Sequence, residues 1–519
     1  MPLRRDIQWY EVDRNIRGLE TDVEPQIAEH EIRVQRETIP LIFIPGIMGT
    51  RLRLAGTNGT GDGADGLPNM RWDPGSSSFM FWNYSGTSAE HRKDMIVGAS
   101  FSSDFLEVAN SDPIGDGFIG IMDDYRAFLR TLRGRDWGPL NKIFEFPVYA
   151  SGYNWTDDNE HAGQLLAQRI QDIIQEAQSV TGLCEKVILI THSMGGLVAR
   201  AASELAGARD SILGIIHGVQ PATGAAAAYW RIKAGFEGFG MTSRVLGNSG
   251  PNVTAILGNI PGGLELLPTK RHRTNAGDRA WLTITENGRV TRALPNSNPY
   301  AEIYRVPAVV RPAHGQRPST NTYWGLVDPA LLTPGQTSAA QPSADASARD
   351  NDSLADASPV VRPWPQYLRM LAIAESFHDN LGAAAHPRTF CFHGTTHHTA
   401  DVIELRIESN WVRNDPYPTR GFRGFFTNTG GHDMQAVLQD PAGGGDGTVP
   451  IFSASSLDDP GRPAPGDRAI PLEHQPAYED ATAQAYTIQA IIALAKMRYQ
   501  DRRAQVGDFP TNGPGSNMA

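Results

Sequence analysis

The sequence has few cysteines and an excess of negative charge. Its 519 residues include only Cys184 and Cys391 as cysteines, which excludes a disulfide scaffold and a four-cysteine zinc site. One disulfide remains allowed, but both residues stand beside apolar runs, which favours two buried free thiols. The net charge of −11 argues against non-specific binding of nucleic acid, because phosphate contacts need clustered Lys and Arg. We therefore expect no nucleic-acid partner.

Long apolar runs are also missing. No run approaches the ~18 residues that a transmembrane helix needs. The opening residues 1–6 carry two arginines with no apolar run behind them, so we expect no signal peptide and synthesis in the cytoplasm. A protein of this kind that acts elsewhere needs a leaderless export route. With 40% hydrophobic and 20% charged residues, the chain can nevertheless bury a sizeable core.

Short apolar runs alternate with helical patterns along much of the chain. This alternation is typical of a mostly parallel sheet with helices on both faces, which is the α/β class. The runs that predict buried strands cover residues 40–46, 145–150, 186–190, 212–217 and 389–393. Apolar residues recur at helical spacing in residues 123–133, 161–180 and 484–497.

The alternation stops between residues 225 and 385, which predicts a large inserted cap rather than more of the sheet. Within it, the Ala- and Ser-rich residues 334–359 predict a mobile loop, and residues 56–66 predict a second one. The expected order is then an N-terminal extension, a first core part, the cap, a second core part and a tail. These cover residues 1–38, 39–224, 225–385, 386–505 and 506–519.

The most informative stretch is Thr191-His-Ser-Met-Gly-Gly196, which directly follows an apolar strand and precedes a helical pattern. This is the pattern of a nucleophile elbow, where a serine sits on a sharp turn between strand and helix. Thr191 departs from the usual G-x-S-x-G pattern, which has glycine at that position. We predict Ser193 as the nucleophile of an α/β-hydrolase.

A serine nucleophile needs a base and an acid that orients it, and in this fold the chain order is serine, acid, histidine. Asp446 lies in the glycine-rich turn Gly443-Gly-Gly-Asp-Gly-Thr-Val-Pro450. His474 is the only histidine after it. The order rule therefore predicts Asp446 and His474 as the partners of Ser193.

The transition state also needs two N–H donors for its oxyanion. The backbone N–H of Met194, after the nucleophile, is one candidate, and that of Ile47, in the loop after the first strand, is the other. The remaining histidines are poorer bases. His393, His397 and His398 have the spacing of a metal cluster but no matched acid or cysteine, so we expect no metal and no cofactor.

Five blocks of the chain together resemble the α/β-hydrolase lipases of the lecithin:cholesterol acyltransferase and lysosomal phospholipase family. The serine motif also resembles the GPI-inositol deacylases. The blocks are Ile44-Pro-Gly-Ile-Met-Gly-Thr-Arg-Leu52, Tyr153-Asn-Trp155, His192-Ser-Met-Gly-Gly196, Pro261-Gly-Gly-Leu-Glu-Leu-Leu-Pro268 and Gly445-Asp-Gly-Thr-Val-Pro450. The resemblance implies the same triad and the same two oxyanion donors. It also implies a phospholipid substrate.

Aromatic residues in 78–84 and 229–236 suit either a transient contact with a membrane surface or the core of a cap. A leaderless acidic lipase is similar to bacterial type VI lipase effectors, which implies action in the periplasm of target cells and a cognate immunity protein as partner. Two alternatives stay open. One is a cytosolic esterase or lipid acyltransferase, and the other is a non-catalytic lipid-binding protein on a hydrolase fold.

Overall fold

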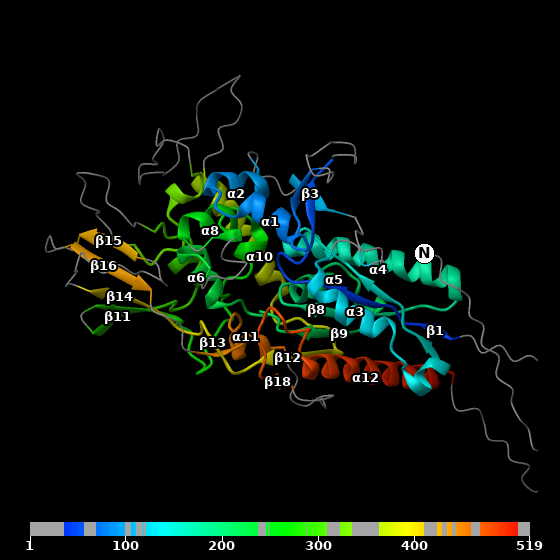
Figure 1. Ribbon diagram of the computed structural model, residues 1–519. Coiled ribbons are helices and arrows are strands. Elements are labelled where there is room, and N and C mark those ends of the chain that lie inside the picture. Colours follow the sequence, from blue (N-terminus) through cyan, green and yellow to red (C-terminus); the bar gives the residue numbers. More distant parts are fainter. Residues whose placement is uncertain are drawn as a thin grey trace, which may run out of the picture.

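The computed structural model covers the whole chain, and its described residues form a layered α/β molecule (Figure 1). The expected N-terminal extension, both expected mobile loops and the tail lie almost entirely outside these residues. The described residues are 36–56, 69–98, 105–109, 118, 121–236, 245–247, 249–286, 288–308, 322–334, 363–408, 423–427, 433–438, 443–457 and 468–506.

A six-stranded parallel sheet forms the centre of the fold, with the strand order β18-β12-β9-β8-β2-β7. This confirms the predicted α/β class. The five predicted strand runs all contribute to it. The strands are β2 (Leu41–Ile44), β7 (Val148–Ala150), β8 (Val187–His192), β9 (Ile212–Gly218), β12 (Thr389–Gly394) and β18 (Ala469–Ile470).

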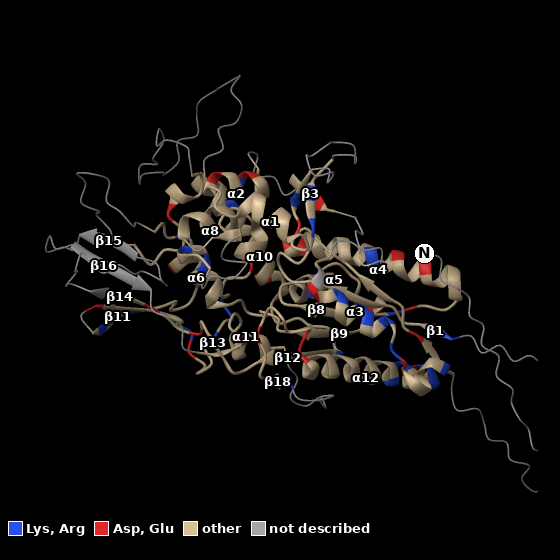
Figure 2. Ribbon diagram, in the orientation of Figure 1, with Lys and Arg blue, Asp and Glu red and all other residues tan. Residues whose placement is uncertain are grey.

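Helices cover both faces of this sheet. Alternate residues of a strand point to opposite faces, so Ile42 and Ile44 join one buried cluster and Leu41 and Phe43 join the other. Figure 2 shows no Lys, Arg, Asp or Glu residue in the central strands, as burial on both faces requires. One face packs against α4 (Asn159–Thr181), α5 (Gly195–Glu204) and α10 (Pro363–Leu381), and the other against α3 (Arg126–Arg133) and α12 (Ala481–Val506).

A second sheet of five strands joins the segment expected to form the cap to the segment expected to form the second core part. Its order is β11-β10-β14-β16-β15, and β10 pairs in parallel with β14. Three of its strands thus come from the segment that we assigned to the second core part. A hairpin of β10 and β11 alone would leave N–H and C=O groups unpaired along the outer edge of β10. Strand β14 pairs with these groups. The strands are β10 (Leu282–Glu286), β11 (Arg289–Leu294), β14 (Ile403–Glu408), β15 (Arg423–Thr427) and β16 (Asp433–Leu438).

Smaller elements lie around the central sheet. The expected domain boundaries stay a prediction, since these elements come from several parts of the chain. The strands are β1 (Glu37–Thr38), β3 (Leu52–Leu54), β4 (Met70–Trp72), β5 (Leu106–Val108), β6 (Phe144–Glu145), β13 (His397–Thr399) and β17 (Gly443–Gly445). The helices are α1 (Ser77–Tyr84), α2 (Ala89–Ile96), α6 (Ala226–Ala234), α8 (Gly250–Leu257), α9 (Pro261–Leu264) and α11 (Ile451–Ser455).

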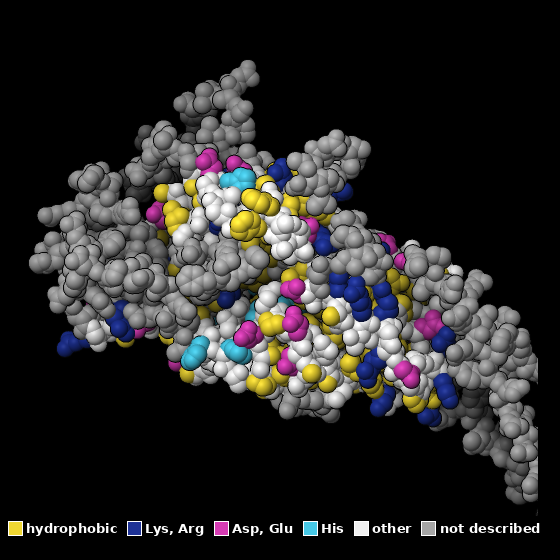
Figure 3. Space-filling view, in the orientation of Figure 1, with side chains coloured by type: hydrophobic (Ala, Val, Ile, Leu, Met, Phe, Trp, Pro, Cys, Tyr) yellow, Lys and Arg dark blue, Asp and Glu magenta, His cyan; other side chains and the backbone are white. Residues whose placement is uncertain are grey.

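Helix α1 exposes two large aromatic side chains. Ser76 caps it by accepting a hydrogen bond from the N–H of Phe79. Met80 is buried, whereas Phe81 and Trp82 are 53% and 77% exposed, and Figure 3 shows hydrophobic side chains on the surface over α1 and α2. No helix in the described part of the chain is both long and apolar enough to cross a bilayer. Cys184 and Cys391 are both buried, and neither is in a disulfide bond.

Candidate active site

Ser193 lies in the turn between β8 and α5, as the elbow pattern predicts. Its φ of 51° is in the left-handed region, and its N–H donates to the Gly218 carbonyl of the neighbouring strand. A Cβ on Gly195 would lie 2.4 Å from the carbonyl oxygen of Pro45, so only glycine allows the turn to approach β2 this closely. The serine oxygen therefore stands at the carboxyl edge of the sheet, at the N-terminus of a helix that favours negative charge.

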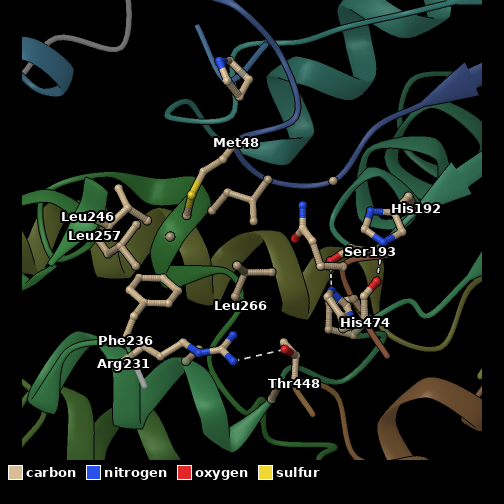
Figure 4. Close-up of a pocket in the computed structure, with 18 of the residues that line it drawn as sticks. Met48, His192, Ser193, Arg231, Phe236, Leu246, Leu257, Leu266, Thr448 and His474 are labelled. Carbon is tan, nitrogen blue, oxygen red and sulfur yellow. Dashed lines mark hydrogen bonds between the residues drawn. The ribbon is translucent and has the colours of Figure 1, made fainter. Parts of the chain in front are cut away.

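Three side chains that are distant in the sequence form one hydrogen-bonded line. The Oγ of Ser193 lies 2.8 Å from Nε2 of His474 (Figure 4). Nδ1 of His474 lies 2.7 Å from Oδ2 of Asp446. The carboxylate is 2% exposed, and its Oδ1 accepts hydrogen bonds from the N–H groups of Thr448 and Val449. A carboxylate held in this way presents its other oxygen only to His474. The structure brings the three residues together, and their role in catalysis stays a prediction.

The turn that carries Asp446 also holds the backbone of the histidine. The N–H of His474 donates to the carbonyl of Asp446 at 2.9 Å. Asp446 itself lies against the end of β12, because a Cβ on Gly394 would come within 2.5 Å of the Asp446 Cβ. The acid and the base are therefore fixed to each other by backbone and side chain together.

His192 is a residue whose part in the site the sequence did not reveal. Its ring is buried, and burial together with the nearby His474 lowers its pKa to about 3, so the ring is neutral. Nε2 lies 2.9 Å from the carbonyl of His474, and Nδ1 lies 2.9 Å from the hydroxyl of Tyr125. Because a carbonyl only accepts, Nε2 carries the proton and Nδ1 accepts from Tyr125.

Tyr125 extends this chain of hydrogen bonds to the loop after β2. Its hydroxyl accepts from the N–H of Gly46 at 3.4 Å, and burial raises its pKa. Hydrogen bonds thus connect the loop after the first strand to the loop that carries His474. They run from Gly46 through Tyr125 and His192 to His474. Local sequence patterns carried no signal for this link, because it passes between four separate segments.

The two predicted oxyanion donors lie in the loop after β2 and in the elbow, which pack against each other at Ser193. Gly46 packs on the nucleophile, because a Cβ there would lie 3.1 Å from the Ser193 Cβ, and Ile47 follows it. Met48 turns the loop with a φ of 65°. Within the described residues, no hydrogen bond occupies the backbone N–H of Ile47 or of Met194. Both groups are therefore available to a ligand, and their role stays a prediction.

Ser193 opens into a cavity of about 570 Å³. Most of the lining is apolar, and Figure 4 shows Met48, Leu246 and Leu257 at the end away from the serine. Arg231 enters the same cavity from α6 and donates to the hydroxyl of Thr448. Such a chamber matches an elongated apolar group that ends in a polar one.

His393 and His397 make no hydrogen bond in the line from Ser193 to Asp446, although His397 forms a β-bridge with Asp446. His397 is in β13, and its Nδ1 lies 4.0 Å from a carboxylate oxygen of Glu473. His393 lies at the end of β12 and is buried. In the part of the chain that the structure describes, no group of three or more His, Cys, Asp or Glu side chains could hold a metal.

Comparison with known proteins gives a partial family match. A family profile described as PGAP1-like alpha/beta domain matches residues 157–234, which contain α4, β8, the elbow and α5. Comparison with curated protein sequences gave no significant match.

Among solved structures, the chain is similar to one described as "The crystal structure of Tle4-Tli4 complex". The two chains are 23% identical, the match covers 89% of this chain and 99% of the other, and the TM-score is 0.66. The mature form of Bacillus licheniformis lipase BlEst2 matches at 13% identity over 44% of this chain and 62% of the other. Its TM-score of 0.16 is too low to carry an argument. Residues 157–234 are thus similar to the PGAP1-like alpha/beta domain, and the chain shares the fold of the first structure.

Proposed function

We propose that the protein is a serine lipase that hydrolyses acyl esters of membrane glycerophospholipids. The observation that carries this proposal is the line of hydrogen bonds from Ser193 through His474 to Asp446, at the mouth of a largely apolar cavity. The line supplies a nucleophile, a base and an orienting acid. The cavity supplies room for an acyl chain.

In the proposed reaction, His474 takes the proton of Ser193 as its Oγ attacks the ester carbonyl. Asp446 holds the ring with Nδ1 protonated, which keeps Nε2 free to accept that proton. The N–H groups of Ile47 and Met194 stabilise the oxyanion. His474 then returns the proton to the leaving alcohol, and water releases the acyl group from Ser193.

The proposed biological role is that of an antibacterial effector of a type VI secretion system, acting in the periplasm of a target cell. Its support is the fold shared with the solved structure of the Tle4-Tli4 complex. In the similar structure, Tle4 is in complex with Tli4. We extend this to a cognate immunity protein that binds and silences the present chain.

A transient contact with a membrane surface belongs to the same proposal. Helix α1 places Met80 in the lining of the cavity and exposes Phe81 and Trp82 on its other side. Large aromatic side chains lower their free energy by entering the interfacial region of a bilayer. The helix would then bring the cavity close to its lipid substrate.

The enzymatic proposal is tested with phosphatidylglycerol vesicles and the variant Ser193→Ala. We expect the wild-type protein to release free fatty acid and the variant to be at least about 10⁴-fold slower, because the nucleophile is lost. Ser203→Ala, which removes another buried hydroxyl from α5, is the matched control. Release of fatty acid by Ser193→Ala at near the wild-type rate would refute the proposal.

The biological proposal is tested by expression in a bacterium that lacks an immunity protein. One form stays in the cytosol, and another carries an added periplasmic signal. An effector should be toxic mainly in the periplasm, and Ser193→Ala should remove the toxicity. A housekeeping esterase should be toxic in neither compartment, and toxicity that survives Ser193→Ala would point to a non-catalytic protein.

A further inference from the structure

The described residues that line the cavity beside Ser193 include one Lys or Arg side chain. This is Arg231, which is half-buried and comes from α6. Its Nη2 donates to Thr448 Oγ1 at 3.1 Å and to the Gly447 carbonyl at 3.5 Å, and its guanidinium carbon lies 5.2 Å from the ring centroid of Phe236. The hydroxyl and the ring hold a planar donor group in a fixed place within the cavity.

The contacts of Arg231 connect it to the turn that carries Asp446, on the side of the leaving group in the proposed reaction. Thr448 follows Asp446 by two residues, and its N–H binds Asp446 Oδ1 at 2.8 Å. Arg231 is therefore bonded to the same turn that holds the carboxylate behind His474. Because His474 protonates the leaving alcohol, groups on this side face the leaving group. In Figure 4, Arg231 lies beside Phe236 and its guanidinium reaches toward Thr448, whereas Leu246 and Leu257 lie beyond Phe236 in this view.

When an acyl ester of a glycerophospholipid is cleaved, the leaving alcohol carries the phosphate. A guanidinium presents its donors in a fork that matches two phosphate oxygens, and such charge-assisted hydrogen bonds are stronger than neutral ones. We propose that Arg231 is the residue that selects phosphate-bearing acyl esters over neutral ones, by binding the phosphate of the leaving alcohol. This inference rests on the proposed lipase function.

A positioning role would give Arg231 a different signature. If it only held the turn of Asp446 through Thr448, its loss would slow the hydrolysis of every ester by a similar factor. If it binds phosphate, its loss lowers the kcat/KM ratio between a substrate with phosphate and one without. The ratio therefore separates the two roles.

The experiment compares dihexanoylphosphatidylcholine with dihexanoylglycerol, which has the same acyl chains and no phosphate. The variants are Arg231→Met, which keeps an unbranched apolar stem and removes the charge and the donors, and Arg231→Lys, which keeps the charge. Arg289→Met, on the exposed strand β11, is the control for loss of one surface charge. We expect the kcat/KM ratio to fall about 10- to 100-fold in Arg231→Met, less in Arg231→Lys, and not in Arg289→Met.

A second measurement uses the wild-type protein and so does not depend on the folding of a variant. Glycerol 3-phosphate and inorganic phosphate are each added during hydrolysis of dihexanoylglycerol. Competitive inhibition by glycerol 3-phosphate, weaker inhibition by inorganic phosphate, and loss of both in Arg231→Met support a site for a lipid phosphate. Stronger inhibition by inorganic phosphate points to a free-phosphate site and overturns the proposal.

An unchanged kcat/KM ratio in Arg231→Met, which means equal losses on both esters or no loss on either, also overturns the proposal. This failure differs from failure of the lipase proposal, in which the wild-type protein would hydrolyse neither ester.

Discussion

Replacing Asp446 by asparagine tests the orientation of the base with almost no change of shape. In the native site, Oδ1 of Asp446 accepts from the N–H groups of Thr448 and Val449, and Oδ2 lies 2.7 Å from Nδ1 of His474. An amide has one oxygen and two N–H donors. If its oxygen keeps both backbone hydrogen bonds, its NH₂ group faces Nδ1 of His474. The reversed orientation sets the NH₂ group against two N–H donors.

The favoured orientation of the amide forces His474 into the wrong tautomer. Nδ1 must then accept a hydrogen bond, so the proton moves to Nε2, which faces Ser193 at 2.8 Å. A protonated Nε2 cannot take the proton of the serine. From the general behaviour of such triads we expect a loss of about 10⁴ in kcat, which corresponds to about 5.4 kcal/mol in activation free energy.

The assay is hydrolysis of p-nitrophenyl butyrate, with thermal unfolding as a check on the fold. Asp401→Asn is the matched control, because Asp401 is another buried carboxylate that accepts from a backbone N–H, that of Asn275, and makes no contact with His474. We expect this control to stay within about tenfold of the wild-type rate, since ordinary hydrogen bonds contribute about 0.5–1.5 kcal/mol. A folded Asp446→Asn protein within tenfold of the wild-type kcat would refute the assignment of Asp446.

Three further expectations follow from the cavity, the exposed helix and the buried histidines. Leu257→Trp fills the apolar end of the cavity, so kcat/KM should fall at least about tenfold more for a palmitoyl ester than for a butyryl ester, and equal losses would contradict this placement of the acyl chain. Trp82→Ser should weaken binding to lipid vesicles in a flotation assay about tenfold, whereas Val290→Ser, which removes another exposed apolar side chain, should not. Burial lowers the pKa of His217 to about 3, so between pH 6.5 and 3 the unfolded chain binds a proton that the folded protein does not. As the pH is lowered, the free energy of unfolding should therefore decrease by about 1.4 kcal/mol per pH unit because of this group. Urea titrations at several pH values measure this dependence, and a His217→Gln protein with the same pH dependence as the wild type would contradict the prediction.

Much of the core and of the candidate site could be read from short stretches of sequence. Strands β2, β8 and β9 are continuous apolar runs because both faces of each are buried, and this pattern is local. The elbow is likewise local, since strand, serine, small residues and helix follow one another. Asp446 and His474 can be predicted from the chain order of the triad and from the absence of other histidines after the acid. Those are facts of the linear sequence.

The remaining features depend on which segments pack together, and that is decided only when the chain is folded. The pairing of β10 with β14 joins segments more than 100 residues apart, so it has no local signature. The same holds for the links from Tyr125 through His192 to His474 and from Arg231 to Thr448. A hydroxyl, an imidazole or a guanidinium forms a hydrogen bond with a suitable donor or acceptor that lies within about 3 Å of it. Their partners are therefore set by the approach of distant elements, which the sheet order and the helices above it determine.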